Sequence, residues 1–215
     1  MKACPAALHR RDVLIRESEN MERDFELKSA RFIAADCMRR FLRPGDRAVD
    51  ATMGNGHDTL ALCRLVGEAG HVYAFDVQTQ AVKNTRLRLR EAGVEDRATL
   101  FHAGHEQMGS LVKPGVQAVM FNLGWLPGGD KAVTTRWATT QQAVQSALEL
   151  LCPGGICVVC IYPGHPAGDE ERQNLLNWLR TLRPQEYNVL AHRFLNAGSG
   201  APECVIVQKQ GGTAC

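Results

Sequence analysis

The stretch DATMGNGHDT, residues 50–59, decides the fold of this chain because it joins an apolar run to a helical pattern through a turn with two glycines. The preceding run RAVDA (47–51) is typical of a buried strand, and a helix is expected over 57–66. In an open sheet of parallel strands, ligands bind beyond the carboxyl ends of the strands, where such a turn lies. Glycine at positions 54 and 56 would let the backbone approach a ligand closely. We therefore interpret 50–59 as a candidate ligand-binding loop.

On both sides of this loop the chain alternates between strand and helix patterns. Further helices are expected over 27–41, 79–92, 137–151 and 171–180, and further strands over 71–76, 97–102, 116–121 and 155–162. The last two apolar runs, 186–195 and 203–209, leave no room for a crossover helix between them, which predicts an antiparallel hairpin. The pattern predicts an α/β fold with a mostly parallel, seven-stranded sheet and helices on both faces. One domain is expected over 26–210, after an N-terminal extension over 1–25.

Composition excludes several classes of protein. The chain has 215 residues, 45% of them hydrophobic and 22% charged, as in ordinary globular domains. The net charge of +2 permits a nucleic-acid partner without indicating one. Cys157 and Cys160 form a CxxC pair inside a strand pattern, and no second pair completes a metal set, so no metal is expected. No apolar run approaches the roughly 20 residues that cross a bilayer, and the first residues have no signal-peptide pattern, so we expect a cytoplasmic protein without a membrane partner.

Acidic and glycine residues at the strand ends indicate a nucleoside-containing cofactor. Asp76 ends the strand pattern 71–76, about twenty residues after Gly54, where an acid contacts ribose hydroxyls. Thr59 stands where the dinucleotide fingerprint has its third glycine, which weakens the alternative of an NAD enzyme. A second alternative is that Asp58 and Thr59 only stabilise the first turn of a helix. His105 and Glu106 follow the next strand at the same edge, as cofactor contacts or as a solvated pair.

The stretch FNLGWLPGGDK, residues 121–131, follows another strand and is a candidate substrate loop. It resembles the Asn-Pro-Pro-aromatic loop of amino-group methyltransferases, with Leu123 and Gly124 in place of the prolines. An amide oxygen at Asn122 can orient the N–H groups of an amine, and Trp125 can stack on an unstacked base, an interaction of about 1–3 kcal/mol. The alternative is a strand-end Asn, a core Trp and an ordinary turn at PGG.

Four blocks together resemble the signature blocks of the MnmM/YtqB family. These are DATMGNGHDT (50–59), FDVQ (75–78), NLGWLPGGDK (122–131) and YPGHPAGDEE (162–171). The resemblance runs from about Lys28 to Lys209 and implies a class I, Rossmann-like methyltransferase that uses S-adenosyl-L-methionine. It implies methylation of 5-aminomethyl-2-thiouridine at the wobble position of tRNA, contact with the anticodon stem-loop, and a homodimer. The family often has Tyr where this chain has Trp125.

The resemblance and the motifs together give the candidate residues. The catalytic candidates are Asn122 and Trp125, with His165 or a water held by Asp130 as the proton acceptor. The cofactor candidates are Thr52, Gly54, Asn55, Gly56, His57, Asp58, Thr59, Asp76, Gln78, His105 and Glu106. The substrate candidates are Leu123, Gly124, Pro127, Gly128, Gly129, Lys131, Tyr162 and Gly164.

Two clusters of basic residues are candidate contacts to RNA. One cluster is Arg39, Arg40 and Arg43, and the other is Lys83, Arg86, Arg88 and Arg90. Clusters of this kind are usually solvated helix faces, which is the alternative for both. The competing functions are methylation of rRNA or of a small amine, and an RNA-binding module without catalysis.

Overall fold

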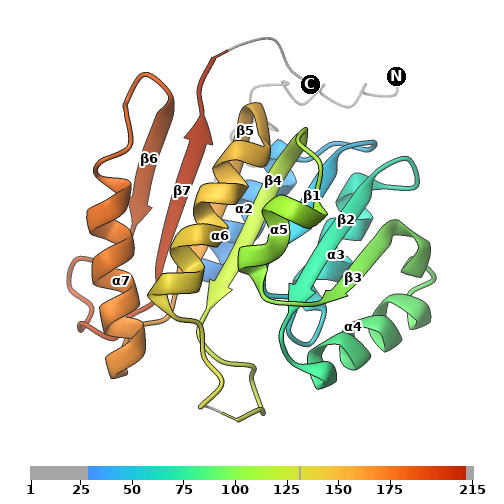
Figure 1. Cartoon of the computed structure of the whole chain (residues 1–215), viewed down its shortest axis with the longest axis horizontal. Coiled ribbons are helices and arrows are strands. Elements are labelled where there is room, and N and C mark those ends of the chain that lie inside the picture. Colours follow the sequence, from blue (N-terminus) through green and yellow to red (C-terminus); the bar gives the residue numbers. More distant parts are fainter. Residues whose placement is uncertain (1–28, 131, 212–215) are drawn as a thin grey trace, which may run out of the picture.

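The computed structural model describes residues 29–130 and 132–211, which form a seven-stranded sheet with the order β3-β2-β1-β4-β5-β7-β6 (Figure 1). The strands are β1 (Arg47–Asp50), β2 (His71–Asp76), β3 (Ala98–His102), β4 (Val116–Leu123), β5 (Leu151–Ile161), β6 (Tyr187–His192) and β7 (Glu203–Lys209). The helices are α2 (Ala30–Phe41), α3 (His57–Val66), α4 (Thr79–Glu91), α5 (Met108–Leu111), α6 (Trp137–Leu150) and α7 (Pro166–Leu179). The extension predicted for residues 1–25 lies outside the described residues.

The pairing of the strands confirms the predicted topology. Strands β3, β2, β1, β4 and β5 are parallel, whereas β7 runs antiparallel between β5 and β6. The order reverses at β1, whose neighbours are β2 and β4. A parallel sheet binds ligands at such a switch point, beyond the carboxyl ends of the strands.

Helices cover both faces of the sheet and bury two apolar cores. Figure 1 shows α5, α6 and α7 in front of the sheet, with α2 and α3 behind it. The front core includes Phe75, Phe121 and Leu148, while the rear core includes Met38, Leu62 and Leu89. Because both faces are buried, the central strands are apolar almost throughout, as in β5, and do not alternate. Among the described residues, no helix combines the length and apolar character that a membrane crossing requires.

Two boundaries differ from the sequence prediction in ways that affect the site. Strand β4 continues to Leu123, two residues beyond the predicted end, because Asn122 and Leu123 pair with Cys160 and Ile161 of β5. Helix α7 begins at Pro166, five residues before the predicted start, because proline is well tolerated in the first helical turn. Asn122 is therefore held by a strand, and His165 is the N-cap of a helix.

Candidate active site

Two adjoining cavities open at the carboxyl ends of the strands around β1 and β4. The first cavity, of about 230 Å³, is lined by residues that follow β1, β2, β3 and β4. The second cavity, of about 690 Å³, is lined by the loop after β1, the end of β4 and helix α2. Volumes of about 300–1,000 Å³ are usual for ligand sites. The two cavities share a wall made of Thr52, Gly54, Asn122, Gly124, Trp125 and Pro127.

A buried carboxylate organises the loop after β1. Asp50 is fully buried and accepts hydrogen bonds from the Thr59 hydroxyl at 2.6 Å and from the Thr52 backbone N–H at 3.2 Å. Burial, reinforced by the nearby Asp58 carboxylate, raises the pKa of Asp50 to about 7. Thr59 thus ties the first turn of α3 to the end of β1, and it lines neither cavity.

The two glycines of this loop have different roles. Gly54 has a φ of +49°, and its backbone N–H donates to Asp76 Oδ2 at 3.0 Å. Gly56 has a φ of +79°, and a Cβ there would lie 2.8 Å from Cα and Oγ1 of Thr85 on α4. Gly54 therefore borders both cavities, whereas Gly56 allows close packing of α4 and lines neither.

Asp76 and His105 are polar residues that line the first cavity. The Asp76 carboxylate is oriented by the backbone N–H groups of Gly54 and Gln78, at 3.0 and 2.9 Å, while burial raises its pKa. His105 is buried, with its ring edge-on to Phe121 at 5.7 Å between centroids. Burial lowers the pKa of His105, which keeps the imidazole neutral near pH 7.

The side chain of Asn122 is held in a fixed orientation inside the shared wall. Its Nδ2 donates to Asp58 Oδ2 at 2.9 Å, and its backbone N–H donates to Thr52 Oγ1 at 2.8 Å. The hydroxyl of Tyr162 lies 3.5 Å from Asn122 Oδ1. Since Asp58 holds the amide nitrogen, the amide oxygen has capacity to accept a further hydrogen bond.

Described residues of the segment 124–135 line both cavities, and a buried glutamate anchors the end of this segment. Thr135 and Gly124 exchange backbone and side-chain hydrogen bonds at 2.9 and 3.0 Å. The Thr135 hydroxyl then donates to Glu171 on α7 at 2.7 Å, and the Thr140 hydroxyl donates to the same carboxylate at 2.6 Å. Glu171 is only 2% exposed, and burial raises its pKa. One carboxylate in α7 thereby fixes the base of the segment, which we call the substrate loop (Gly124–Thr135).

Other contacts connect the substrate loop to the loop after β1. Asn55 donates to the carbonyl of Pro127 at 3.3 Å and accepts from Asn84 at 2.8 Å. Arg88 of α4 donates to the Asn55 carbonyl at 2.8 Å and lies 3.1 Å from His57 Nε2. The two loops are therefore one hydrogen-bonded unit.

Two catalytic candidates have structural contacts outside both cavities. His165 Nδ1 accepts a hydrogen bond from the backbone N–H of Gly168 at 3.2 Å, which caps α7. The His165 ring packs against Trp125, with 4.7 Å between centroids. Asp130 Oδ1 accepts from the backbone of Ala132 at 2.9 Å within the substrate loop. Neither His165 nor Asp130 is among the described residues that line the cavities.

The remaining candidates divide between the cavities. The first cavity alone is lined by Asp76, Gln78, His105 and Glu106, the second alone by Asn55, His57, Asp58, Leu123 and Tyr162, and Thr52 and Gly54 line both. Gly124 and Pro127 line both cavities, whereas Gly128, Gly129 and Gly164 line neither, and Lys131 lies outside the described residues. Sequence reasoning missed Glu171 and the face of α2 that lines the second cavity, except for Arg39 as a possible RNA contact. The sequence signal for α2 was Phe32, a large apolar residue that lies off the apolar side of this helix and at helical spacing from Arg39.

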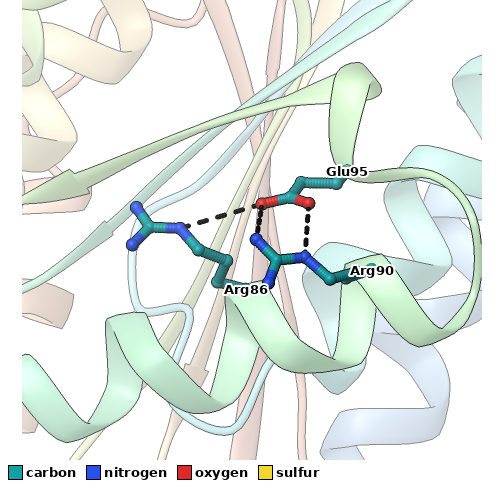
Figure 2. Close-up of polar contacts among 3 residues, drawn as sticks. All are labelled: Arg86, Arg90 and Glu95. Carbon is teal, nitrogen blue, oxygen red and sulfur yellow. Dashed lines mark hydrogen bonds and ion pairs between the residues drawn. The ribbon is translucent and has the colours of Figure 1, made fainter.

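The basic cluster on α4 is largely occupied by contacts within the protein. Figure 2 shows Arg86 and Arg90 reaching toward Glu95, with the shortest nitrogen–oxygen distances at 3.9 and 3.0 Å. Arg88 is bonded to the loop after β1. Just after the end of α2, Arg43 donates to the carbonyls of Arg40 and Leu42. Arg39 forms an ion pair with Asp36 and still borders the second cavity.

The strand order, the switch point at β1 and the paired cavities are those of a class I, Rossmann-like methyltransferase. Residues 72–208 match the model of the family described as "Putative rRNA methylase", and the chain belongs to this family. A solved structure from Clostridium thermocellum, titled a "putative rRNA-methylase", has 40% sequence identity and a TM-score of 0.85. That likeness covers 86% of this chain and 100% of the other.

Two further relatives carry more specific descriptions. A "putative methyltransferase" from Streptococcus mutans, solved in complex with SAH, has 34% identity and a TM-score of 0.78 over 86% of this chain and 99% of that chain. The chloroplastic "tRNA (mnm(5)s(2)U34)-methyltransferase" of Arabidopsis thaliana is 40% identical over 157 residues, which is 68% of this chain. This chain spans 57% of the length of the Arabidopsis protein.

Proposed function

We propose that this protein uses S-adenosylmethionine to methylate the exocyclic amine of 5-aminomethyl-2-thiouridine at the wobble position of tRNA. The observation that carries the proposal is the Asn122 amide, held by Asp58 in the wall between two cavities. The printed name of the Arabidopsis relative supports the nucleoside, and the SAH complex of the Streptococcus relative supports the methyl donor.

The first cavity has side chains suited to an S-adenosyl group. Asp76 offers carboxylate oxygens for ribose hydroxyls, because each oxygen has a further lone pair beyond its backbone bond. His105 is buried and neutral beside the apolar Phe121, which suits an uncharged purine. Gly54 lines both cavities and has no side chain that would narrow either one. S-adenosylmethionine supplies a methyl group made electrophilic by its sulfonium.

The second cavity supplies the groups that present the amine. Asn122 Oδ1 accepts a hydrogen bond from the substrate N–H and so directs the nitrogen lone pair toward the first cavity. Trp125, which is 36% exposed, presents its ring for stacking on the thiouracil base. In the transfer a C–N bond forms and the S–CH₃ bond breaks; sulfur keeps the electron pair and the amine releases one proton.

A group must accept that proton, because a primary aliphatic amine has a pKa of roughly 10 and is protonated at neutral pH. Asp58 is the acidic side chain among the described residues that line the second cavity. Its carboxylate is also bonded to Asn122, so an ammonium that approaches the amide oxygen meets a negative charge next to it. Asp58 is therefore better positioned to accept the proton than His165 or Asp130, which line neither cavity.

The test is methyl transfer from labelled S-adenosylmethionine, followed by mass analysis of the RNA nucleosides. The substrates are tRNA with 5-aminomethyl-2-thiouridine, unmodified tRNA and rRNA. We expect one added methyl on that nucleoside alone, and loss of this product for Asn122→Ala while S-adenosylmethionine still binds. Methylation of rRNA instead would favour the function that the family description names, and transfer to neither RNA would refute both.

We also propose a cytoplasmic location, expected from the sequence, and a homodimer, which the resemblance to the family implies. Light scattering coupled to size-exclusion chromatography measures the second directly. A mass equal to that of one chain, 23.6 kDa, at micromolar concentration would refute the homodimer.

A further inference from the structure

Helix α2 forms one wall of the second cavity. Arg31, Phe32, Ala35 and Arg39 of this helix line the cavity together with Asn122 and Trp125. Residues 31, 35 and 39 are four apart, so they share one side of the helix, while the adjacent side, with Ala34 and Met38, is buried in the rear core. This outer face of α2 is continuous with the proposed acceptor site.

The composition of this face is unusual for a helix surface. Phe32 is 49% exposed although it is large and apolar. The guanidinium carbon of Arg31 lies 4.9 Å from the centroid of the Phe32 ring. Arg39, at the other end of the face, is exposed beside the cavity. An exposed aromatic ring between two arginines matches what single-stranded RNA offers, since bases stack on rings and phosphates bind guanidinium groups.

We propose that the outer face of α2 is an RNA-binding wall on which Phe32 stacks a base adjacent to the methylated nucleotide, while Arg31 and Arg39 contact the flanking phosphates. The inference rests on the proposed function, because α2 would bind the nucleotides next to the one whose amine contacts Asn122. The size of the cavity supports it: about 690 Å³ is generous for one modified base and leaves room for part of a second nucleotide. Position supports it as well, because Arg31 and Arg39 line the second cavity, whereas Arg86 and Arg90 of α4 pair with Glu95 and line neither cavity.

The first part of the test concerns stacking and compares Phe32→Leu with Phe32→Tyr. Leucine keeps most of the apolar volume but cannot stack, whereas tyrosine keeps the ring. We expect Phe32→Leu to raise the KM for tRNA by about 5- to 150-fold, the range for one base stacked on an aromatic ring, and Phe32→Tyr to stay near wild type. Equal activity of Phe32→Leu and wild type would overturn the stacking role.

The second part concerns phosphate contacts and compares Arg39→Ala with Arg40→Ala on the same helix. Arg40 is exposed but does not line the cavity, so it is the matched control. We expect Arg39→Ala to lower the salt slope of tRNA binding, measured by fluorescence anisotropy, by roughly 0.7–0.9 per phosphate contact, and Arg40→Ala to leave it unchanged. Equal slopes for both variants and wild type would overturn the phosphate role.

Two readouts distinguish failure of this inference from failure of the proposed function. Affinity for S-adenosylmethionine should stay at the wild-type value in every α2 variant, because none of these residues lines the first cavity. If wild-type protein methylates its nucleoside and the α2 variants match it, the wall is wrong and the reaction stands. If wild-type protein binds the methyl donor but methylates no RNA, both proposals fail.

Discussion

Replacement of Glu171 tests whether a buried carboxylate on α7 positions the substrate loop. In the folded protein Glu171 accepts from the hydroxyls of Thr135 and Thr140, and Thr135 in turn holds Gly124. Glu171→Ala removes both acceptors and leaves two hydroxyls without their partners. An unsatisfied group costs about 1–3 kcal/mol at the buried Thr140 and less at the half-buried Thr135, whose hydroxyl still accepts from Gly124, so we expect the free energy of unfolding to fall by about 1–4 kcal/mol.

Of the two hydrogen bonds that Glu171 accepts, only the one from Thr135 holds the substrate loop, so the expected change in kinetics follows from the loss of that bond. If its loss appears fully in loop closure, about 1–3 kcal/mol, then kcat/KM falls by about 5- to 150-fold. Affinity for S-adenosylmethionine should fall too, because Thr135 and Trp125 also line the first cavity. Glu171→Gln keeps one acceptor oxygen, so its effects on stability and on kcat/KM should lie between those of wild type and Glu171→Ala.

The matched control is Glu203→Gln, which weakens a different contact of α7. Arg172 donates to Glu203 at 2.6 and 3.0 Å, and this pair touches neither cavity. The assays are urea unfolding, calorimetric titration of S-adenosylmethionine and steady-state kinetics with tRNA. If Glu171→Ala and Glu203→Gln lower kcat/KM equally at the same loss of stability, the positioning role of Glu171 is refuted.

Three further predictions concern titration and proton transfer. Burial raises the pKa of Asp50 from 3.8 to about 7, so the folded protein binds this proton more tightly than the unfolded chain does. The stability that Asp50 contributes at low pH is therefore lost as pH rises from about 4 to 7. In urea unfolding, the wild type should lose up to about 4 kcal/mol over this window relative to Asp50→Asn, and parallel curves of unfolding free energy against pH would contradict this prediction. Asp58→Asn keeps an oxygen that can accept from Asn122 but removes the negative charge. We expect kcat at neutral pH to fall by about 10²–10⁴-fold and to recover partly at high pH. An unchanged pH–rate profile would exclude Asp58 as the proton acceptor. His165→Asn keeps a residue favoured as a helix cap, so it should retain the wild-type pH–rate profile; loss of one limb of that profile would restore His165 as the base.

The fold was predictable because its signals are local. The alternation of strand and helix patterns gave all seven strands, and the short loop between β6 and β7 gave the hairpin. Boundaries were predicted less well where a residue type allows two outcomes: Pro166 indicated a loop but starts a helix. Asn122 and Asp76 were predicted as site residues because each ends or follows an apolar run.

The rest of the site depends on contacts that no local pattern encodes. Gly56 was expected near a ligand, but the neighbour that requires glycine there is Thr85, 29 positions along the chain. The partner of Glu171 is Thr135, 36 positions away, and neither residue belongs to a pattern that indicates the other. The wall provided by α2 depends on how that helix crosses the sheet, which amphipathic spacing alone does not specify.

The division into two cavities has a consequence for how such proteins diversify. Among the residues that line one cavity only, those at the ends of β2 and β3 belong to the first cavity, and those of α2 belong to the second. Substitutions on α2 can therefore alter the second cavity without touching the residues that line the first one. Under the proposed function, acceptor choice can then change through one helix while the binding of the methyl donor stays as it is.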